Sequence, residues 1–248
     1  MSTEVTVALL AAVTSLVVAT ISVWRTGVNE KKVVDLELRA KSAERAMTAK
    51  EELDHYREPL LRAAIDLASR LDNIRASGYL DKYLSDGGRR SQIARISTFY
   101  RFARYWCVVE NLYASVAMVR FEQDEQTKDV AGMLRKLGKA FATDDYGEDF
   151  MMWRDEQRAV AELARGSAAM PEVIGFAQFY ESYEDVFAPW FRAFDRDLAG
   201  STAHDSARFR ALQRKLAQLA GRLDLSGTYR KQCKKLLKAA GDEPPATG

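Results

Sequence analysis

The sequence predicts an all-α protein with a single N-terminal transmembrane helix, a short coiled-coil stalk and a cytoplasmic helical bundle. Residues 5–24 (VTVALLAAVTSLVVATISVW) form one uninterrupted apolar segment without a charged residue. Proline is scarce, and glycine falls mainly between periodic segments, which favours helices along the rest of the chain. Apolar residues then recur at spacings of three and four, the pattern of amphipathic helices.

Residues 5–24 have the length of a membrane span, because a helix that rises about 1.5 Å per residue crosses a core of about 30 Å in twenty residues. Residues 1–4 carry no Lys or Arg and no cleavage motif follows, so we expect a retained anchor and no signal peptide. Basic residues follow the segment directly, namely Arg25, Lys31, Lys32, Arg39, Lys41 and Arg45. This asymmetry predicts a single-pass protein of the cell membrane with residues 1–4 outside and the C-terminal domain in the cytoplasm.

One face of the predicted span carries small residues and the other carries bulky ones. The small face consists of Ala8, Ala11, Ala12, Ser15, Ala19 and Ser22. Small residues let helix backbones approach closely, so this face predicts self-association, with Ser15 and Ser22 at the seam or lining a narrow pore. The alternative is a passive anchor, because such spacings are common in membrane helices.

Residues 25–58 predict a juxtamembrane helix or stalk. Val33, Leu36, Ala40, Ala43 and Met47 alternate at spacings of three and four, which is a short heptad seam. The next seam positions are occupied by charged residues, so a solvated single helix is the alternative interpretation.

Residues 59–240 predict the cytoplasmic helical domain, and residues 241–248 a disordered tail. Pro59 is expected to open a new helix that ends near Ala76, and residues 78–90 are expected to be a loop. The helix expected at residues 91–126 is apolar nearly all round, which places it at the centre of the bundle. Further helices are expected near residues 127–141, 149–165, 171–199 (interrupted at Pro189), 202–224 and 228–240.

The sequence offers little for catalysis, cofactor binding or metal binding. The chain has two histidines and two cysteines, and GMLRKLGK at residues 132–139 lacks the spacing of a phosphate-binding loop. We therefore expect no enzyme, no cofactor and no metal site. Gln157 falls on the apolar face of its predicted helix, where its amide needs a hydrogen-bond partner from a neighbouring segment or, less simply, from a ligand.

Charge is segregated along the cytoplasmic domain. Residues 110–197 contain ten basic and eighteen acidic groups, whereas residues 206–240 contain ten basic groups and a single acidic one, Asp224. The candidate polyanion-binding residues are Arg208, Arg210, Arg214, Lys215, Arg222, Arg230, Lys231, Lys234, Lys235 and Lys238, with Tyr229 as a stacking residue. Three partners fit this charge: the acidic part of the same protein or of a neighbouring subunit, anionic lipid, and nucleic acid.

Five blocks carry a family resemblance: YREPLLRAAIDLASRLDNI (56–74), STFYRFARYWCVVENL (97–112), FMMWRDEQRAVAELA (150–164), FAPWFRAFDRDL (187–198) and RFRALQRKLAQLAGRLD (208–224). Together they resemble an uncharacterised bacterial family of membrane-tethered all-helical proteins. The resemblance implies a shared helical cytoplasmic domain and carries over no activity. In architecture alone, the chain is also similar to the DNA-gated channel component of the Hailong bacterial antiviral system.

Two functional classes follow. The first is a non-enzymatic, membrane-anchored homo-oligomer, a ligand-gated effector or channel in antiviral defence whose cytoplasmic domain binds a polyanion such as an oligonucleotide. The second is a passive membrane-tethered scaffold that recruits a protein partner.

Overall fold

The structure is a computed structural model that describes residues 3–84, 87–115, 125–166, 173–200 and 203–241. Within these ranges, the side chains of residues 3–14, 16–32, 35, 45, 49, 81, 125 and 126 are not described. Every named element of the described chain is a helix, so the predicted all-α class is confirmed. The chain divides into two compact units, residues 1–48 and 49–248, which are treated separately below.

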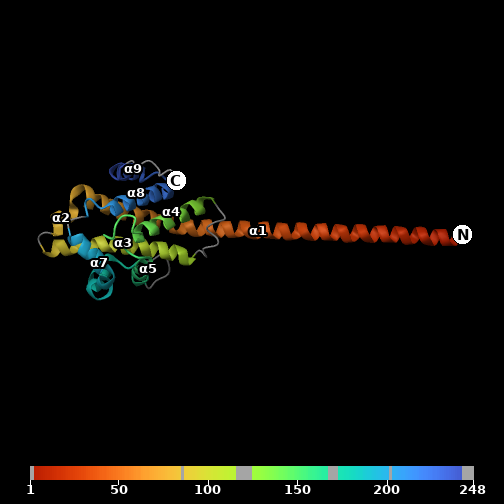
Figure 1. The fold of residues 1–248 in the computed structure, drawn as a ribbon, viewed down its shortest axis with the longest axis horizontal. Coiled ribbons are helices and arrows are strands. Elements are labelled where there is room, and N and C mark those ends of the chain that lie inside the picture. The colour runs from red at the N-terminus through yellow and green to blue at the C-terminus, as the bar shows by residue number, and fades with distance from the viewer. Residues whose placement is uncertain (1–2, 85–86, 116–124, 167–172, 201–202, 242–248) are drawn as a thin grey trace. The chain divides into compact units, whose positions relative to one another are not determined.

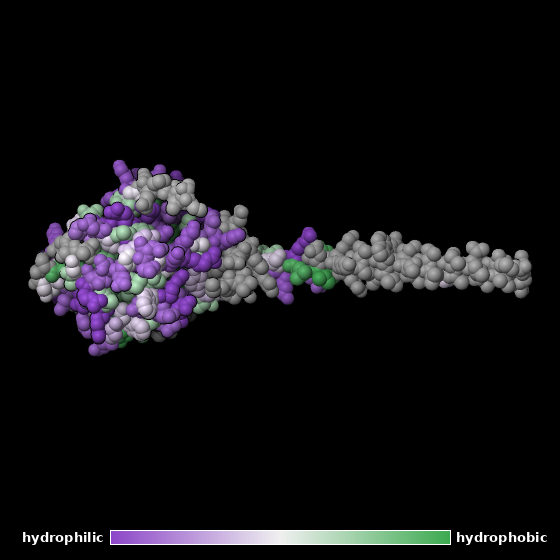
Figure 2. All heavy atoms as spheres, viewed as in Figure 1, coloured by the Kyte–Doolittle hydropathy of each residue, from purple (hydrophilic) through white to green (hydrophobic). Residues whose placement is uncertain are grey.

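The first unit is formed by the N-terminal part of helix α1, which runs without interruption from Thr3 to Ser77. The predicted seam lies on its surface, since Val33 is 52%, Leu36 64% and Met47 65% exposed, and Ala40 and Ala43 are exposed as well. Figure 2 shows apolar residues in green on the part of the first unit whose side chains are described, where Val34 and Leu38 are exposed as well. A single copy of the helix therefore leaves its seam uncovered.

The predicted span falls largely outside the described side chains, because only Ser15 of residues 5–24 has a described environment, and it is exposed. Among the side chains that the structure does describe, no helix offers a stretch long and apolar enough to cross a membrane. The helix expected from the span into the stalk is present as backbone.

Helix α1 continues through Pro59, so the prediction of a new helix at this residue is wrong. A proline inside a helix removes one backbone hydrogen bond and costs about 3 kcal/mol. Tyr56, Leu60 and Leu61 around it are buried in the core of the second unit, and each buried side chain of this size returns about 1.5–3 kcal/mol. Packing on both sides of the proline thus maintains the helix.

The second unit consists of the C-terminal part of α1 and the helices that follow it (Figure 1). These are α2 (Tyr79–Leu84), α3 (Arg89–Ser115), α4 (Glu125–Ala142), α5 (Arg154–Leu163), α6 (Phe176–Ser182), the π-helix η2 (Tyr183–Phe187), α7 (Ala188–Ala199), α8 (Ala207–Leu223) and α9 (Arg230–Ala239). Helix α2 lies within the range that was predicted to be a loop, which is a correction. Its last turn packs Leu84 against the core.

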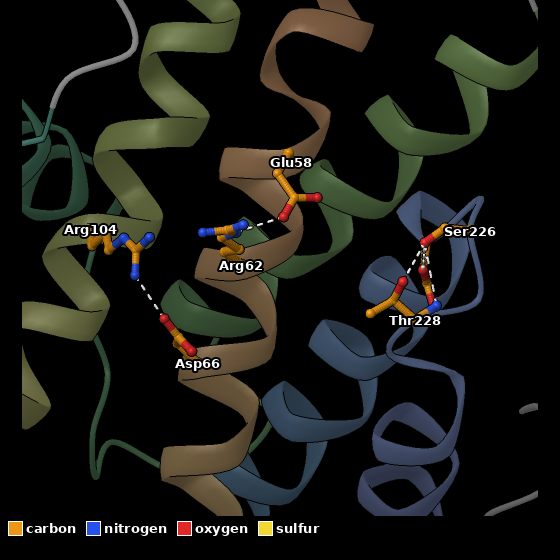
Figure 3. A network of polar contacts seen from close by, with 7 residues as sticks. Glu58, Arg62, Asp66, Arg104, Ser226 and Thr228 are labelled. Atoms are coloured by element: carbon orange, nitrogen blue, oxygen red, sulfur yellow. Dashed lines mark hydrogen bonds and ion pairs between the residues drawn. The ribbon is translucent and has the colours of Figure 1, made fainter.

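Helix α3 is the centre of the second unit, as its apolar sequence predicted. It contacts α2, α5 and α6, and Arg104 of α3 pairs with Asp66 of α1 at 2.7 Å (Figure 3). Its aromatic residues meet those of α7: the ring centroids of Phe99 and Phe191 are 4.6 Å apart, and those of Phe102 and Phe194 are 4.9 Å apart. Such offset and edge contacts add to the stabilisation from burial.

Several helix boundaries differ from the prediction: α4 already begins at Glu125, within the range 91–126 expected as one helix, and α8 begins at Ala207, five residues later than expected. Two further differences have a packing cause. The interruption expected at Pro189 lies earlier, in η2, where a wider π-turn lets both Tyr183 and Phe187 point into the core. Helix α5 begins at Arg154, five residues later than expected, because Phe150 adopts a left-handed φ of 58°. The Phe150 ring is fully buried and its backbone N–H donates to Asp197 Oδ2 at 2.8 Å, and these contacts support the strained backbone.

Candidate polyanion interface

Helix α9 is held in place by the turn that precedes it. Ser226 Oγ lies 2.7 Å from Thr228 Oγ1 (Figure 3). Ser226 Oγ also lies 3.1 Å from Asp224 Oδ1, and the Tyr229 N–H donates to Asp224 Oδ2 at 2.8 Å. Gly227 has a φ of 74°, a backbone conformation that glycine adopts without strain. The only acidic residue of the basic C-terminal segment is therefore used to build this turn.

One side of α9 is fixed to the bundle. Cys233 and Leu236 are buried, and Gln213 of α8 donates through Nε2 to the Leu236 carbonyl at 2.9 Å. Gln232 Nε2 donates to Ser69 Oγ of α1 at 2.9 Å. With one face committed to α1 and α8, the remaining arc of the helix faces solvent.

The solvent arc of α9 is uniformly basic. At about 100° per residue, its five cations cover a continuous arc of about 140°. They are Arg230, Lys231, Lys234, Lys235 and Lys238, all exposed. Helix α9 contains no acidic residue, so this arc, called the α9 arc below, concentrates positive charge on one surface.

Within the part of the chain that the structure describes, no carboxylate forms an ion pair with the α9 arc. Residues 110–197, the acidic part of the chain, form one described ion pair with the basic segment, residues 206–240. It joins Asp129 to Arg222 at 3.4 Å. Both of these side chains are substantially exposed, so this contact contributes little. The described acidic residues of the same chain therefore do not neutralise the α9 arc.

Arg208 is set apart from the other candidate residues, because it is fully buried. Its guanidinium donates to the carbonyls of Asp149 (2.9 Å), Ala140 (2.8 Å) and Phe141 (3.1 Å), and also to that of Gly147. Burial lowers the pKa of this guanidinium. A side chain occupied in this way ties α8 to the loop after α4 and does not reach a polyanion.

Of the remaining candidates, Arg214 also has a structural role, and Tyr229, Arg210 and Lys215 differ in how exposed they are. Arg214 donates to the carbonyls of Ala240 (3.2 Å) and Gly241 (3.0 Å) and so caps the end of α9. Tyr229 is partly buried against the core, which leaves less of its ring for stacking than the sequence suggested. Arg210 is exposed and Lys215 is half-buried at the edge of α8.

Two cations near α8 escaped the sequence argument. Lys136 of α4 acts on Lys215, and Arg75 of α1 lies within electrostatic range of Arg210 and Arg214. Lys136 belongs to the range that is acidic when counted along the chain, yet α4 itself carries four basic and two acidic residues. The net charge of the α4 sequence taken alone, instead of that of the whole range 110–197, was the signal that could have identified Lys136.

Gln157 has a structural role. It is 5% exposed, and its Nε2 donates to the Met152 carbonyl at 2.8 Å and to the Gly138 carbonyl at 3.5 Å. These bonds satisfy the amide within the bundle and link α5 to α4.

A surface groove of about 560 Å³ lies apart from the basic segment, between the first turns of α3 and helix α6. Phe176, Tyr180 and Ile93 line it with apolar surface, and Arg89 and Gln92 are among its polar lining residues. Among the described residues, no three His, Cys, Asp or Glu side chains are grouped as a metal site.

Comparison with family models, curated proteins and solved structures finds nothing that matches this chain.

Proposed function

We propose that the protein is a membrane-anchored homo-oligomer whose helical domain binds single-stranded nucleic acid through the α9 arc. The observation that carries this proposal is the arc itself, five exposed cations on one helix without a carboxylate partner in the described chain. A row of cations along a helix suits the repeating phosphates of a polyanion and releases the counterions of the strand on binding.

Self-association is supported by the uncovered seam of α1. Apolar side chains that are more than half exposed at heptad spacing are stable when a second helix covers them. A second copy is the occupant that we propose, because every copy would be anchored by residues 5–24 with the same orientation, so that the seams of neighbouring copies run parallel. The small face of residues 5–24 would continue the contact within the membrane.

A channel is the specific form of effector that we propose. Ser15 and Ser22 would line a narrow conduit, and polyanion binding at the α9 arc would change the arrangement of the stalks. The architectural similarity to a DNA-gated channel of bacterial antiviral defence supports this form, and its support is limited to architecture.

Binding of a fluorescent single-stranded oligonucleotide to the full chain in neutral-lipid nanodiscs tests the proposal. The variant Lys234→Glu with Lys235→Glu should weaken binding by about tenfold or more and flatten the salt dependence by about 1.4 in log–log slope. The matched control is Arg89→Glu with Arg90→Glu, an exposed adjacent basic pair on α3 that undergoes the same change in charge. If both variants lost the same affinity for the oligonucleotide, the change in net charge alone would explain the loss, and the assignment of the interface to α9 would be overturned.

A scaffold that recruits a protein partner is the second candidate, favoured by the groove between α3 and α6. Its apolar lining, together with the polar side chains of Arg89 and Gln92, fits a short peptide segment with an apolar anchor. Under this alternative, Tyr180→Ala abolishes partner recovery while the α9 variant retains it.

A further inference from the structure

Helices α4 and α8 are antiparallel neighbours whose register is fixed at both ends. Arg222, near the end of α8, pairs with Asp129 near the start of α4. Arg208, at the start of α8, donates to the carbonyls of Ala140 and Phe141 at the end of α4. Residues that lie between these two contacts on the facing edges are therefore opposite each other.

Between the two ends, this register brings two lysines together. Lys136 follows Asp129 by seven residues, and Lys215 precedes Arg222 by seven, so each lies about two turns inward on the same edge of its helix. Opposite charges pair at the outer position, whereas at this inner position two lysines lie on the facing edges. Lys215 is half-buried, and Lys136 is exposed.

The electrostatics of Lys215 reflect an incomplete site. Burial lowers the pKa of this ammonium, and Lys136 and Arg214 lower it further. Among the residues that the structure describes, no carboxylate offsets this effect. Like charges in a partly desolvated edge are unfavourable until an anion lies between them.

Further cations lie where α8 faces α1, but there carboxylates offset their positive charge. Burial lowers the pKa of Arg75, Arg210 and Arg214 add to this effect, and Asp72 and Asp205 oppose it. On the α4 edge, Asp129 pairs with Arg222, and among the described residues no carboxylate is recorded against Lys215, two turns further inward.

We propose that the edge between α4 and α8 holds one phosphate group of the bound nucleic acid, with Lys136 and Lys215 as its two ligands. This inference rests on the proposed function. It adds a phosphate site between α4 and α8, separate from the α9 arc. The half-buried position of Lys215 favours a strand over a membrane, because a phosphodiester enters a groove between helices, whereas a flat bilayer meets protruding side chains first.

The first test uses pyrophosphate and the full chain in neutral-lipid nanodiscs. Pyrophosphate should raise the unfolding temperature of the wild type, and Lys215→Gln should weaken its binding by about tenfold. Lys128→Gln is the matched control, since Lys128 is also an exposed lysine of α4 and lies about two turns from Lys136. Without pyrophosphate, Lys215→Gln should unfold at the wild-type temperature or above it, because the variant removes a repulsion. Equal pyrophosphate affinity in wild type and Lys215→Gln would overturn the site.

The second test separates this inference from the proposed function. Lys215→Gln should reduce the salt slope of oligonucleotide binding by about 0.7, and Lys234→Glu with Lys235→Glu should leave pyrophosphate binding unchanged. If oligonucleotide binding depends on α9 but not on Lys215, the phosphate site fails and the proposed function stands. If it depends on Lys215 but not on α9, the proposed interface fails and the phosphate site stands. Lys215-dependent binding to phosphatidylglycerol vesicles, with no oligonucleotide binding, would overturn nucleic acid as the ligand.

Discussion

At the scale of single residues, Arg208 departs most from its prediction as a polyanion-binding residue. Arg210, two residues away, is an exposed cation, but the Arg208 guanidinium donates to carbonyls of the end of α4 and of the loop between α4 and α5. Buried carbonyls that lose their donor are costly, because water cannot replace it. The residue therefore contributes to stability and not to binding.

Arg208→Met keeps the volume of the side chain and removes its donors, so we expect the free energy of unfolding to fall by about 3 kcal/mol or more. Urea unfolding followed by circular dichroism in detergent measures the loss. Arg210→Met, two residues away and exposed, is the matched control and should change stability by no more than about 0.5 kcal/mol. Comparable losses in both variants would contradict the structural role of Arg208.

The two thiols provide a prediction on pH. Burial raises the pKa of Cys107 to about 11, and burial also raises the pKa of Cys233. At about pH 8 only about one Cys107 in a thousand is thiolate, so native protein should react very slowly with Ellman's reagent. The folded state holds the Cys107 proton more tightly than the unfolded state does. Its contribution to stability is therefore complete below about pH 9 and is lost as the pH rises through about 11.

Ser226→Cys, an exposed position, provides the positive control and should react at the rate of a free thiol. In denaturant, both natural cysteines should react fully. Rapid labelling of Cys107 in a native Cys233→Ala variant would show that the interior opens readily and would contradict the prediction.

At the scale of helices, α1 offers two leucines for a controlled comparison. Leu36 lies on the seam and is 64% exposed, while Leu38 lies off the seam and is 63% exposed. Leu36→Glu should place charge within the parallel contact and shift the protein to smaller oligomers by about tenfold or more in dissociation constant. Leu38→Glu adds the same charge at the same exposure and should leave the assembly intact. Mass photometry in nanodiscs measures both, and equal effects would reject the seam.

The sequence predicted those features of the helices that are determined within a single segment, and it missed those that depend on packing against distant helices. The central position of α3 follows from its own apolar residues, and the basic arc of α9 follows from helical periodicity; both are visible in a single segment. The continuity of α1 through Pro59 and the late start of α5 at Phe150 depend on packing against distant helices. The same holds for the site, because the pairing of Lys136 with Lys215 exists only in the register of α4 on α8.

At the scale of the whole molecule, charge counted along the chain misrepresents charge in space. The acidic range 110–197 includes α4, whose cations lie beside α8, and its described carboxylates leave the α9 arc unpaired. Positive surface on α8 and α9 thus remains available to a partner molecule. In an oligomer, each copy would present such a surface beneath the membrane, and a polyanion that bridges copies would gain avidity from several arcs at once.

This arrangement leads to a prediction about the assembled protein in planar bilayers. If the small face of residues 5–24 lines a conduit, the oligomer should conduct ions, and oligonucleotide should change the current. Ser15→Phe should reduce conductance because it fills the narrow face, while Leu16→Phe, one residue on and on the predicted lipid face, should leave it unchanged. Lys234→Glu with Lys235→Glu should retain basal conductance and lose the response to oligonucleotide, since the binding surface is separate from the conduit. No current from an oligomer of verified stoichiometry would reject the channel, and a dimer would leave little room for one, so that the same seam would then serve only to pair the anchors.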